Sequence, residues 1–221
     1  MEQTSPRSAG VRTGAFRELV YWFAKRMIDV LAALALLVIL APVLVAIAVA
    51  IAIDSGLPII YLSQRMGRYG RPITVLKFRT MRDGSHHHLR ELLTADEELL
   101  LEYRVARKLR LDPRRTRVGS FLRRTSLDEL PQLFNVLTGD MSLVGPRPYF
   151  AGELSGRPEA EVILLVRPGI TGLWQVSGRS ERSFDERIRL DVDYVQRRGF
   201  LLDLGLIART IGAVISGRGA Y

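Results

Sequence analysis

The chain has no cysteine, and its three histidines are consecutive, at His86, His87 and His88. The absence of cysteine excludes disulfide bonds and thiolate metal sites, and it fits a reducing compartment. Neighbouring side chains of a helix or strand point in different directions, so three adjacent histidines rarely converge on one ion. We therefore interpret the three histidines as part of a polar loop rather than as a metal site.

Acidic residues are also in the minority. The chain of 221 residues carries 32 Lys and Arg against 23 Asp and Glu, which gives a net charge of +9, mostly from arginine. Such a chain is attracted to polyanions, which include nucleic acids, acidic lipids and phosphorylated substrates. The sequence shows no aromatic-studded basic strand and no recognition helix, which nucleic-acid binding would require. The length predicts one modest domain with an additional segment.

Charge is missing altogether from residues 30–53, which read "VLAALALLVILAPVLVAIAVAIAI". At about 1.5 Å per residue, a helix of this length spans the roughly 30 Å hydrocarbon layer of a bilayer. The run is too long for the apolar core of a signal peptide, and no small-x-small cleavage signature follows it. A core helix of a soluble protein would show a polar face, which is absent here. We therefore expect a helix embedded in a membrane.

Basic residues flank this apolar segment on both sides, so the positive-inside rule places both of its ends in the cytoplasm. They are Lys25 and Arg26 before the segment, and Arg65, Arg68, Arg71 and Lys77 after it. Pro42 lies near the midpoint, where its missing N–H and its ring would kink the helix. We favour a re-entrant helix over the alternative of a straight crossing. Lys25 and Arg26 would then contact lipid phosphates, with Asp29 pairing locally.

The sequence as a whole predicts an α+β, mainly helical fold in three parts. Residues 1–15 are rich in small and polar residues and indicate a flexible tail. Residues 16–53 would form an amphipathic helix at the membrane surface and then the re-entrant membrane helix hairpin. Residues 54–221 would form a small cytoplasmic domain with a short β-hairpin and amphipathic interfacial helices.

Within this domain, residues 59–62 and 73–78 predict the β-hairpin, joined by the turn "GRYGRP". We expect helices over residues 87–110 and 116–124, after Pro131 as far as Gly139, and in two segments that start near Phe184 and Phe200. The second of these two segments is strongly apolar and would pack on the core or lie along the bilayer. The stretches "GDMSLVGPRP" and "RPGITGLWQVSG" predict rigid loops, the latter with an exposed Trp174.

Many basic side chains stand next to glycine or proline turns, which would present each guanidinium in a fixed direction. They include Arg65, Lys77, Arg79, Arg123, Arg124, Arg147, Arg167 and Arg179. Planar recognition of phosphate oxygens suits this arrangement, and a diphosphate is a natural ligand. The alternative for any single arginine is an ordinary solvated side chain.

Two adjacent acids, Asp128 and Glu129, lie in "RRTSLDELPQL" among these basic residues. A carboxylate can attack phosphorus and form an acyl phosphate, and nearby arginines would keep it ionised. The second acid could help to hold Mg2+, which binds few carboxylates and otherwise uses phosphate oxygens and water. The alternative is structural, because "SLDEL" is also a good helix start with Ser126 as its cap.

From "AKRMIDV" to "SGRGAY" the chain resembles the bacterial sugar transferases, which are also known as monotopic phosphoglycosyl transferases. The resemblance rests on "KFRTM", on "RRTSLDELPQLFNVLTGDMSLVGPRP" and on "RPGITGLWQVSGR". It implies an enzyme of the cell inner membrane, with residues 54–221 as its catalytic domain on the cytoplasmic face. The family's re-entrant helix is broken by a Ser-Pro pair, whereas here Ala41 precedes Pro42.

The resemblance further implies transfer of a sugar 1-phosphate from a UDP-sugar to undecaprenyl phosphate, with release of UMP and Mg2+ as cofactor. Asp128 would be the nucleophile and Glu129 its partner, and both would hold the metal. Phosphate-binding positions are expected at Lys77, Arg79, Arg123 and Arg147. Of these, Arg123 would serve the lipid phosphate and Arg147 the nucleotide.

The ending "SGRGAY" is similar to the branch of the family that uses hexoses, so glucose or galactose is favoured over an N-acetylamino sugar. The product would start an exopolysaccharide, O-antigen or capsule-type glycan. Two alternatives of another class are a membrane-tethered protein that binds polyanions without catalysis and a lipid-phosphate scaffold. UMP release would distinguish the transferase from both.

Overall fold

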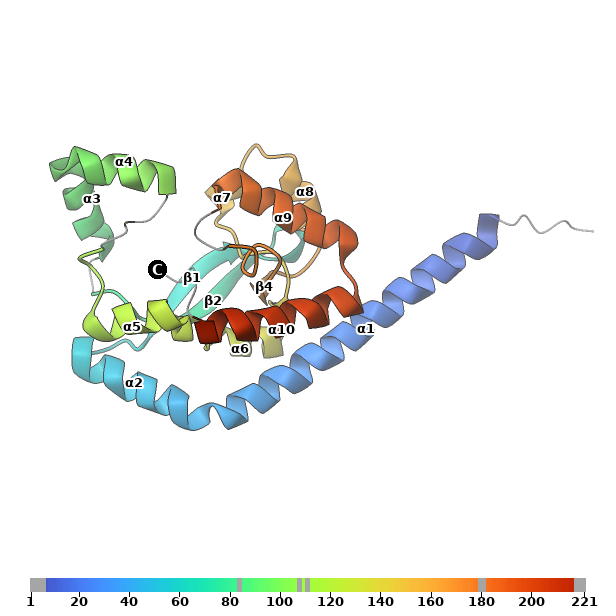
Figure 1. Cartoon of the computed structure of the whole chain (residues 1–221), viewed down its shortest axis with the longest axis horizontal. Helices are drawn as coiled ribbons and strands as arrows, with labels where there is room; N and C mark the ends of the chain where they lie inside the picture. Colours follow the sequence, from blue (N-terminus) through green and yellow to red (C-terminus); the bar gives the residue numbers. More distant parts are fainter. Residues whose placement is uncertain (1–6, 83–84, 107–108, 110–111, 179–181, 217–221) are drawn as a thin grey trace, which may run out of the picture.

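The computed structural model describes residues 7–82, 85–106, 109, 112–178 and 182–216. Two consecutive helices, α1 (Arg7–Ile39) and α2 (Ala41–Ser55), form a bent base along which the remaining elements lie (Figure 1). α1 therefore begins inside the segment for which the sequence predicted a flexible tail. The prediction of an α+β, mainly helical fold is confirmed, because two small sheets accompany many helices.

The axes of α1 and α2 differ by 63° at a break between Ile39 and Ala41. Pro42 lies in the first turn of α2 and has no N–H to donate to the carbonyl of Val38, which would otherwise continue one helix through this point. The neighbouring bonds survive, from Leu40 N to Leu36 O and from Leu44 N to Leu40 O, both at 2.8 Å. The predicted kink at Pro42 is therefore present.

Within the described residues, no single helix is long and apolar enough to cross a bilayer. The bent pair Glu18–Ile39 and Ala41–Ser55 meets the criteria of length and composition when its two members are taken together. Large apolar side chains on this pair stay exposed, among them Leu31, Val38, Ile39, Val45, Val49 and Ile53. The other face of the pair is covered by the rest of the protein.

Each arm of the base helps to form a hydrophobic core. Ala33 of α1 packs with β2 (Pro72–Phe78) and α6 (Gln132–Thr138) in a buried cluster that also contains Val75, Leu133, Val136 and Met141. Ile47 and Ile51 of α2 pack with Phe78 of β2 and Leu122 of α5 (Arg117–Thr125) in a second cluster. The base and the domain are thus parts of one packed structure.

The basic residues near the start of the apolar segment contact protein groups. Lys25 Nζ lies 2.7 Å from Asp203 Oδ2, and both side chains are about nine-tenths buried. Arg26 donates to the carbonyls of Val136 and Leu137, near the end of α6. Asp29 accepts from the backbone N–H of Leu143, far away in sequence. The expected headgroup contact of Lys25 and the local pairing of Asp29 were therefore wrong, whereas a lipid contact of the half-buried Arg26 stays a prediction.

The predicted β-hairpin is confirmed. Strand β1 (Ile60–Met66) pairs antiparallel with β2 (Pro72–Phe78), with Ile60 opposite Phe78. A short 3-10 turn, η1 (Arg68–Gly70), joins the two strands, and Tyr69 within it adopts φ 58°.

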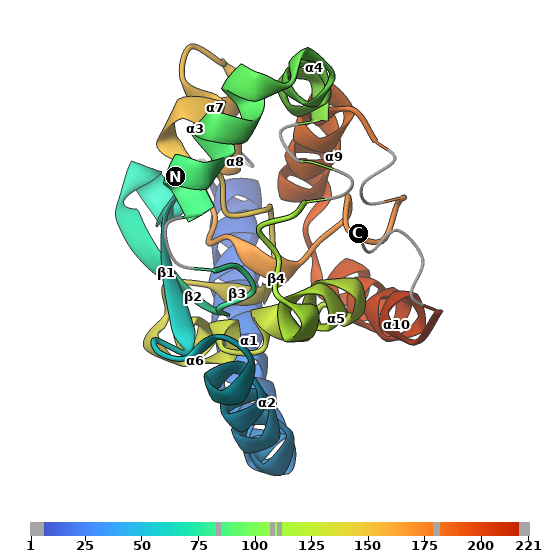
Figure 2. The same cartoon turned by 90° about the vertical axis from the view of Figure 1, so that its left-hand side faces the viewer.

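Next along the chain come α3 (Ser85–Ala95) and α4 (Glu97–Ala106), which stand away from the base (Figures 1 and 2). The sequence predicted one helix over residues 87–110, whereas two helices form with a break at Asp96. The three histidines at 86–88 belong to α3 and not to a loop. Their side chains lie outside the described part of the structure.

Two helices frame the adjacent acids. Helix α5 (Arg117–Thr125) begins at Thr116, whose hydroxyl accepts from Gly119 N at 2.9 Å. Helix α6 (Gln132–Thr138) ends at Gly139 with φ 90°, as its sequence predicts. Between them lies a single 3-10 turn, η2 (Leu127–Glu129).

Ser126 has a different role from the one expected. It adopts φ 58°, the left-handed conformation that terminates α5, and its side chain caps no helix. The prediction of Ser126 as the cap of a helix that starts at "SLDEL" was therefore wrong. The sharp turn at Ser126 is what redirects the chain before Asp128.

The two segments predicted as rigid loops contain short strands, β3 (Ser142–Val144) and β4 (Gly169–Thr171), which pair in parallel. Trp174 is half-buried rather than exposed. The remaining helices are α7 (Ala151–Leu154), α8 (Glu159–Ile163), α9 (Phe184–Arg197) and α10 (Phe200–Ser216). The last two confirm the helices predicted from Phe184 and Phe200.

Candidate active site

Asp128 and Glu129 occupy the η2 turn and face the hairpin. Asp128 is only 8% exposed, whereas Glu129 is partly buried. Lys77, near the end of β2, places its Nζ 2.7 Å from Glu129 Oε1. The structure therefore brings three of the predicted site residues together from two segments about fifty residues apart.

The two carboxyls differ in their ionisation. Burial raises the pKa of Asp128 to about 6, and the neighbouring charge of Glu129 adds to this effect, while Lys77 and Arg123 oppose it. Burial also acts on Glu129, but Lys77, Arg147 and a hydrogen bond from Gln132 outweigh it and lower the pKa of that carboxyl. As the pH rises, Glu129 therefore loses its proton before Asp128 does. Above about pH 6 Asp128 is ionised as well, and it can then act as a nucleophile.

Arg123 and Arg147 approach this pair from different directions. Arg123, in the last turn of α5, donates from Nε to Thr80 Oγ1 at 3.0 Å, and its charge acts on Asp128. Arg147 follows β3 and acts on Glu129, while its Nη1 lies 3.3 Å from Glu153 Oε1. The charge of Arg123 thus acts on Asp128, and the charge of Arg147 acts on Glu129.

Arg79 does not belong to this group, although it stands two residues after Lys77. Its guanidinium is buried and donates to the carbonyls of Ser55, Gly56 and Leu57, which follow the last turn of α2. These contacts make Arg79 a capping group for α2. The expectation that Arg79 binds a phosphate is therefore not supported by its position.

Asp191 of α9 holds the loop that carries Arg147. Its Oδ2 accepts from Tyr149 Oη at 2.7 Å and from the backbone N–H of Arg147 at 3.1 Å. The residue is completely buried, and this burial raises its pKa to about 7. Sequence reasoning missed this residue because the pattern of α9 marks only a charged helix.

Two further arginines lie near the acids. Arg65 of β1 stacks 3.3 Å above the centre of the Phe150 ring, and burial together with the charge of Arg147 lowers its pKa to about 10. Arg115 lies near Arg123 and Asp128, whose charges influence its pKa. The sequence marked Arg65 only as one of many basic residues at turns, and it carried no signal for Arg115.

Within the described residues, no group of three or more His, Cys, Asp or Glu side chains could hold a metal ion by itself. Asp128 and Glu129 alone nevertheless suit Mg2+, which commonly takes one or two carboxylates and completes its shell with substrate phosphates and water. A metal held in this way would come to the site together with a diphosphate.

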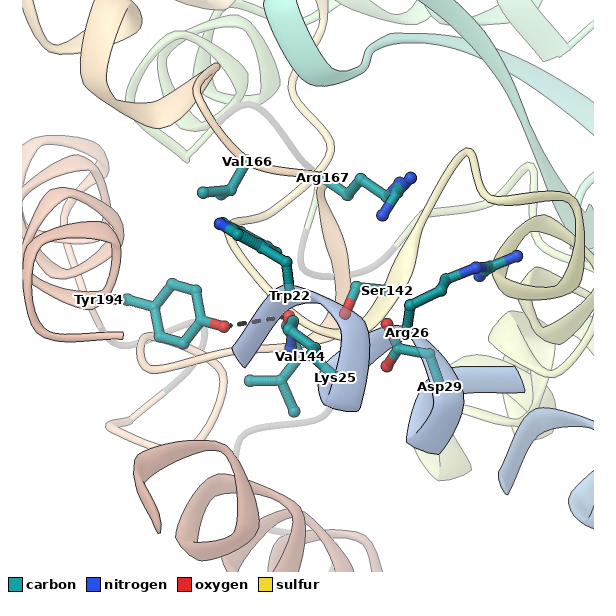
Figure 3. A pocket seen from close by; sticks show the side chains of 9 residues that line it. All are labelled: Trp22, Lys25, Arg26, Asp29, Ser142, Val144, Val166, Arg167 and Tyr194. Carbon is teal, nitrogen blue, oxygen red and sulfur yellow. Dashed lines mark hydrogen bonds between the residues drawn. The ribbon is translucent and has the colours of Figure 1, made fainter. Parts of the chain in front are cut away.

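The more enclosed cavities lie elsewhere. A small one sits between α1 and β3 and is lined by Lys25, Asp29, Ser142 and Arg167 among others (Figure 3). Neither this cavity nor a second one beside Arg147 includes Asp128 or Glu129.

Residues 20–217 match the family model described as bacterial sugar transferase. The chain is 42% identical to "Exopolysaccharide production protein ExoY" of Rhizobium meliloti, over 99% of this chain and 96% of that protein. It is 44% identical to "UDP-galactose-lipid carrier transferase" of Erwinia amylovora, over 90% of this chain but only 42% of that longer protein. It is 41% identical to "UDP-glucose:undecaprenyl-phosphate glucose-1-phosphate transferase" of Caulobacter vibrioides, over 89% of this chain and 72% of that protein.

The chain therefore belongs to the bacterial sugar transferase family, as the resemblance of its motifs implied. Among its relatives are proteins named for the transfer of galactose or glucose phosphate to a lipid carrier. Its class is that of the phosphoglycosyl transferases.

Proposed function

We propose that this protein transfers a hexose 1-phosphate from a UDP-sugar to undecaprenyl phosphate, releases UMP, and thereby starts an exopolysaccharide, O-antigen or capsule-type glycan. The observation that carries the proposal is the Asp128–Glu129 pair, with Lys77 and two arginines around it. The names of relatives that act on galactose and glucose support a hexose donor over an N-acetylamino sugar.

The reaction proceeds in two displacements at one phosphorus. A carboxylate oxygen of Asp128 attacks the phosphorus that bears the sugar, and the bond from that phosphorus to UMP breaks, so UMP leaves with the bonding electrons. An oxygen of undecaprenyl phosphate then attacks the same phosphorus, and the Asp128 carboxylate leaves. The product is an undecaprenyl diphosphate sugar, and the enzyme returns to its starting state.

Each residue of the site has a role in these steps. Lys77 pairs with Glu129 and keeps that carboxyl ionised. We assign Arg147, whose charge also acts on Glu129, to the nucleotide diphosphate. Arg123 approaches Asp128 from the α5 side, where we place the lipid phosphate. Asp128 and Glu129 would hold Mg2+, which when bound neutralises charge on the diphosphate.

We further propose that α1 and α2 enter the bilayer from the cytoplasmic face of the cell inner membrane and return to it. The exposed apolar side chains along both helices support this, since soluble proteins rarely leave so large an apolar surface uncovered. The 63° bend and the basic residues on both flanks favour a re-entrant path. Membrane lipids are then partners of the protein.

The covalent step is the most direct test of the proposed function. Purified protein in lipid discs is mixed with Mg2+ and a UDP-sugar labelled in the sugar, without acceptor. We expect the label to attach to the chain with about one UMP released per site, and Asp128→Asn to abolish both. Asp193→Asn, the same substitution at a surface aspartate of α9, serves as the matched control.

The same assay identifies donor and metal. UDP-glucose, UDP-galactose and UDP-N-acetylglucosamine are compared, each with and without a chelator. Absence of labelling with both hexoses would refute the proposed hexose donor. Labelling that survives in Asp128→Asn would refute Asp128 as the nucleophile.

A further inference from the structure

Arg114 and Arg115 are adjacent in sequence, but their surroundings differ. Arg114 forms a two-pronged pair with Asp112, from Nε to Oδ1 at 2.7 Å and from Nη2 to Oδ2 at 2.6 Å. The Asp112 carboxylate is thereby occupied. Arg115 forms no ion pair with any residue that the structure describes.

Only some N–H groups of the Arg115 guanidinium have a hydrogen-bond acceptor. Its Nη2 makes one long contact, 3.4 Å to the carbonyl of Leu109. Its Nε is buried and has no acceptor in the described structure. A buried charged donor without an acceptor is costly, so its retention indicates an acceptor that arrives from outside the chain.

Arg115 and Arg123 are held near each other by Thr80. The Thr80 hydroxyl accepts from Arg123 Nε at 3.0 Å, and the Thr80 carbonyl accepts from Thr116 N at 3.1 Å. Gly119 packs so tightly on this carbonyl that a Cβ there would lie 2.1 Å from the oxygen. The two arginines are therefore fixed in position despite their like charges.

This arginine pair lies on one particular side of Asp128. Burial and the charge of Arg123 both lower the pKa of Arg115, and Asp128 opposes them in part. The charges that lower the pKa of the other acid, Glu129, come from Lys77 and Arg147. The arrangement leaves an excess of positive charge at Asp128 on the α5 side.

The α5 side is also the side of the apolar base. Helices α2 and α5 are neighbours (Figures 1 and 2), and Asp54 Oδ2 near the end of α2 accepts from Val118 N at 3.0 Å. α2 exposes Val45, Val49 and Ile53. A ligand that joins an anionic head to a long apolar tail would reach Asp128 from here.

We propose that Arg115, together with Arg123, binds the phosphate monoester of the lipid acceptor, so that Arg115 acts in the second displacement and not in the first. The inference rests on the proposed function, because it assigns a residue to one of its two substrates. Arg115 adds a rigid fork of N–H donors that can donate to two phosphate oxygens at once.

The test separates the two half-reactions. The first is the release of UMP without acceptor, whose burst amplitude counts the folded, competent sites. The second is the acceptor-dependent turnover with undecaprenyl phosphate. We compare the wild type with Arg115→Ala, Arg115→Gln and Arg115→Lys, and we use Arg117→Ala, an exposed arginine at the start of α5, as control.

For Arg115→Ala and Arg115→Gln we expect an unchanged burst amplitude and burst rate, and a turnover per competent site reduced roughly 10- to 100-fold, mainly through a higher KM for the lipid phosphate. Arg115→Lys should recover part of the loss because it restores the charge without the fork. A merely structural role would lower the burst amplitude and leave the turnover per competent site unchanged.

Unchanged turnover per competent site, or an equal loss in both half-reactions, would overturn the assignment of Arg115. A higher KM for the UDP-sugar alone would assign the arginine to the donor diphosphate and would overturn the inference as well. Absence of a burst in the wild type would instead refute the proposed function, so the two failures are distinguishable.

Discussion

Lys25 Nζ and Asp203 Oδ2 lie 2.7 Å apart and join α1 to α10 across almost the whole length of the chain. Tyr21 and Tyr194 also donate to the Asp203 carboxylate, at 3.0 and 2.8 Å. Removing one partner of such a buried ion pair destabilises the folded protein, because the other charge remains buried and unpaired.

We therefore expect Lys25→Ala to lower the free energy of unfolding by about 3 to 5 kcal/mol, measured by thermal melting. The double variant Lys25→Met with Asp203→Leu should lose less, because it leaves no unpaired charge. Arg197→Ala, which breaks an exposed pair with Asp193, should cost less than about 1 kcal/mol. Equal losses in the buried and exposed pairs would contradict this interpretation.

Arg79 and Lys77 should respond differently to substitution. Arg79→Ala removes the donors at the end of α2 and should destabilise the protein by about 2 to 3 kcal/mol. The KM for the UDP-sugar should stay unchanged in the protein that remains folded. A raised KM for the UDP-sugar at an unchanged melting temperature would indicate that Arg79 binds a phosphate after all.

Lys77→Met should change the pH dependence of UMP release. The charge of Lys77 lowers the pKa of both Asp128 and Glu129, so its loss raises both values. A larger fraction of Asp128 is then protonated at a given pH, and the acidic limb of the profile moves to higher pH by about 1 unit. Lys77→Arg keeps the charge and should leave the limb near its original position. An identical limb in Lys77→Met would show that Lys77 does not control these acids.

Asp191→Asn should stabilise the protein at alkaline pH. The pKa of Asp191 is about 7 in the folded protein, against 3.8 for an ordinary aspartate, so the folded state loses stability as pH rises between these values. Asparagine does not ionise and avoids this loss, which is on the order of 4 kcal/mol before weaker hydrogen bonds are subtracted. Melting temperatures at pH 5 and pH 8 measure it, with Asp193→Asn as control. A difference from the wild type that is independent of pH would count against the raised pKa.

Pro42→Ala tests the re-entrant path. Alanine restores an N–H toward the Val38 carbonyl and should favour a straighter helix. Because the chain has no cysteine, single cysteines at the exposed positions Glu18 and Leu57 can be labelled cleanly in oriented membrane vesicles. Both should react from the cytoplasmic side in the wild type, and the Glu18 position should become partly protected in Pro42→Ala. Labelling of the two positions from opposite sides in the wild type would exclude the re-entrant path.

Short-range chemistry made several elements predictable. The hairpin follows from two apolar runs around a glycine turn, the end of α6 follows from Gly139, and the kink follows from Pro42. The adjacent acids were visible for the same reason, since they are neighbours in the chain. The sequence by itself thus determined the fold class, the family motifs and the acids at the centre of the site.

Only the tertiary structure decided which basic residues accompany those acids. Lys77 and Arg79 are two residues apart in one motif, yet the strand ends between them, so one meets Glu129 and the other meets the end of α2. The partners of Lys25 and Arg115 likewise depend on contacts between distant segments. Charge pairing acts through space, and no local pattern records which segments the packing of the core will bring together.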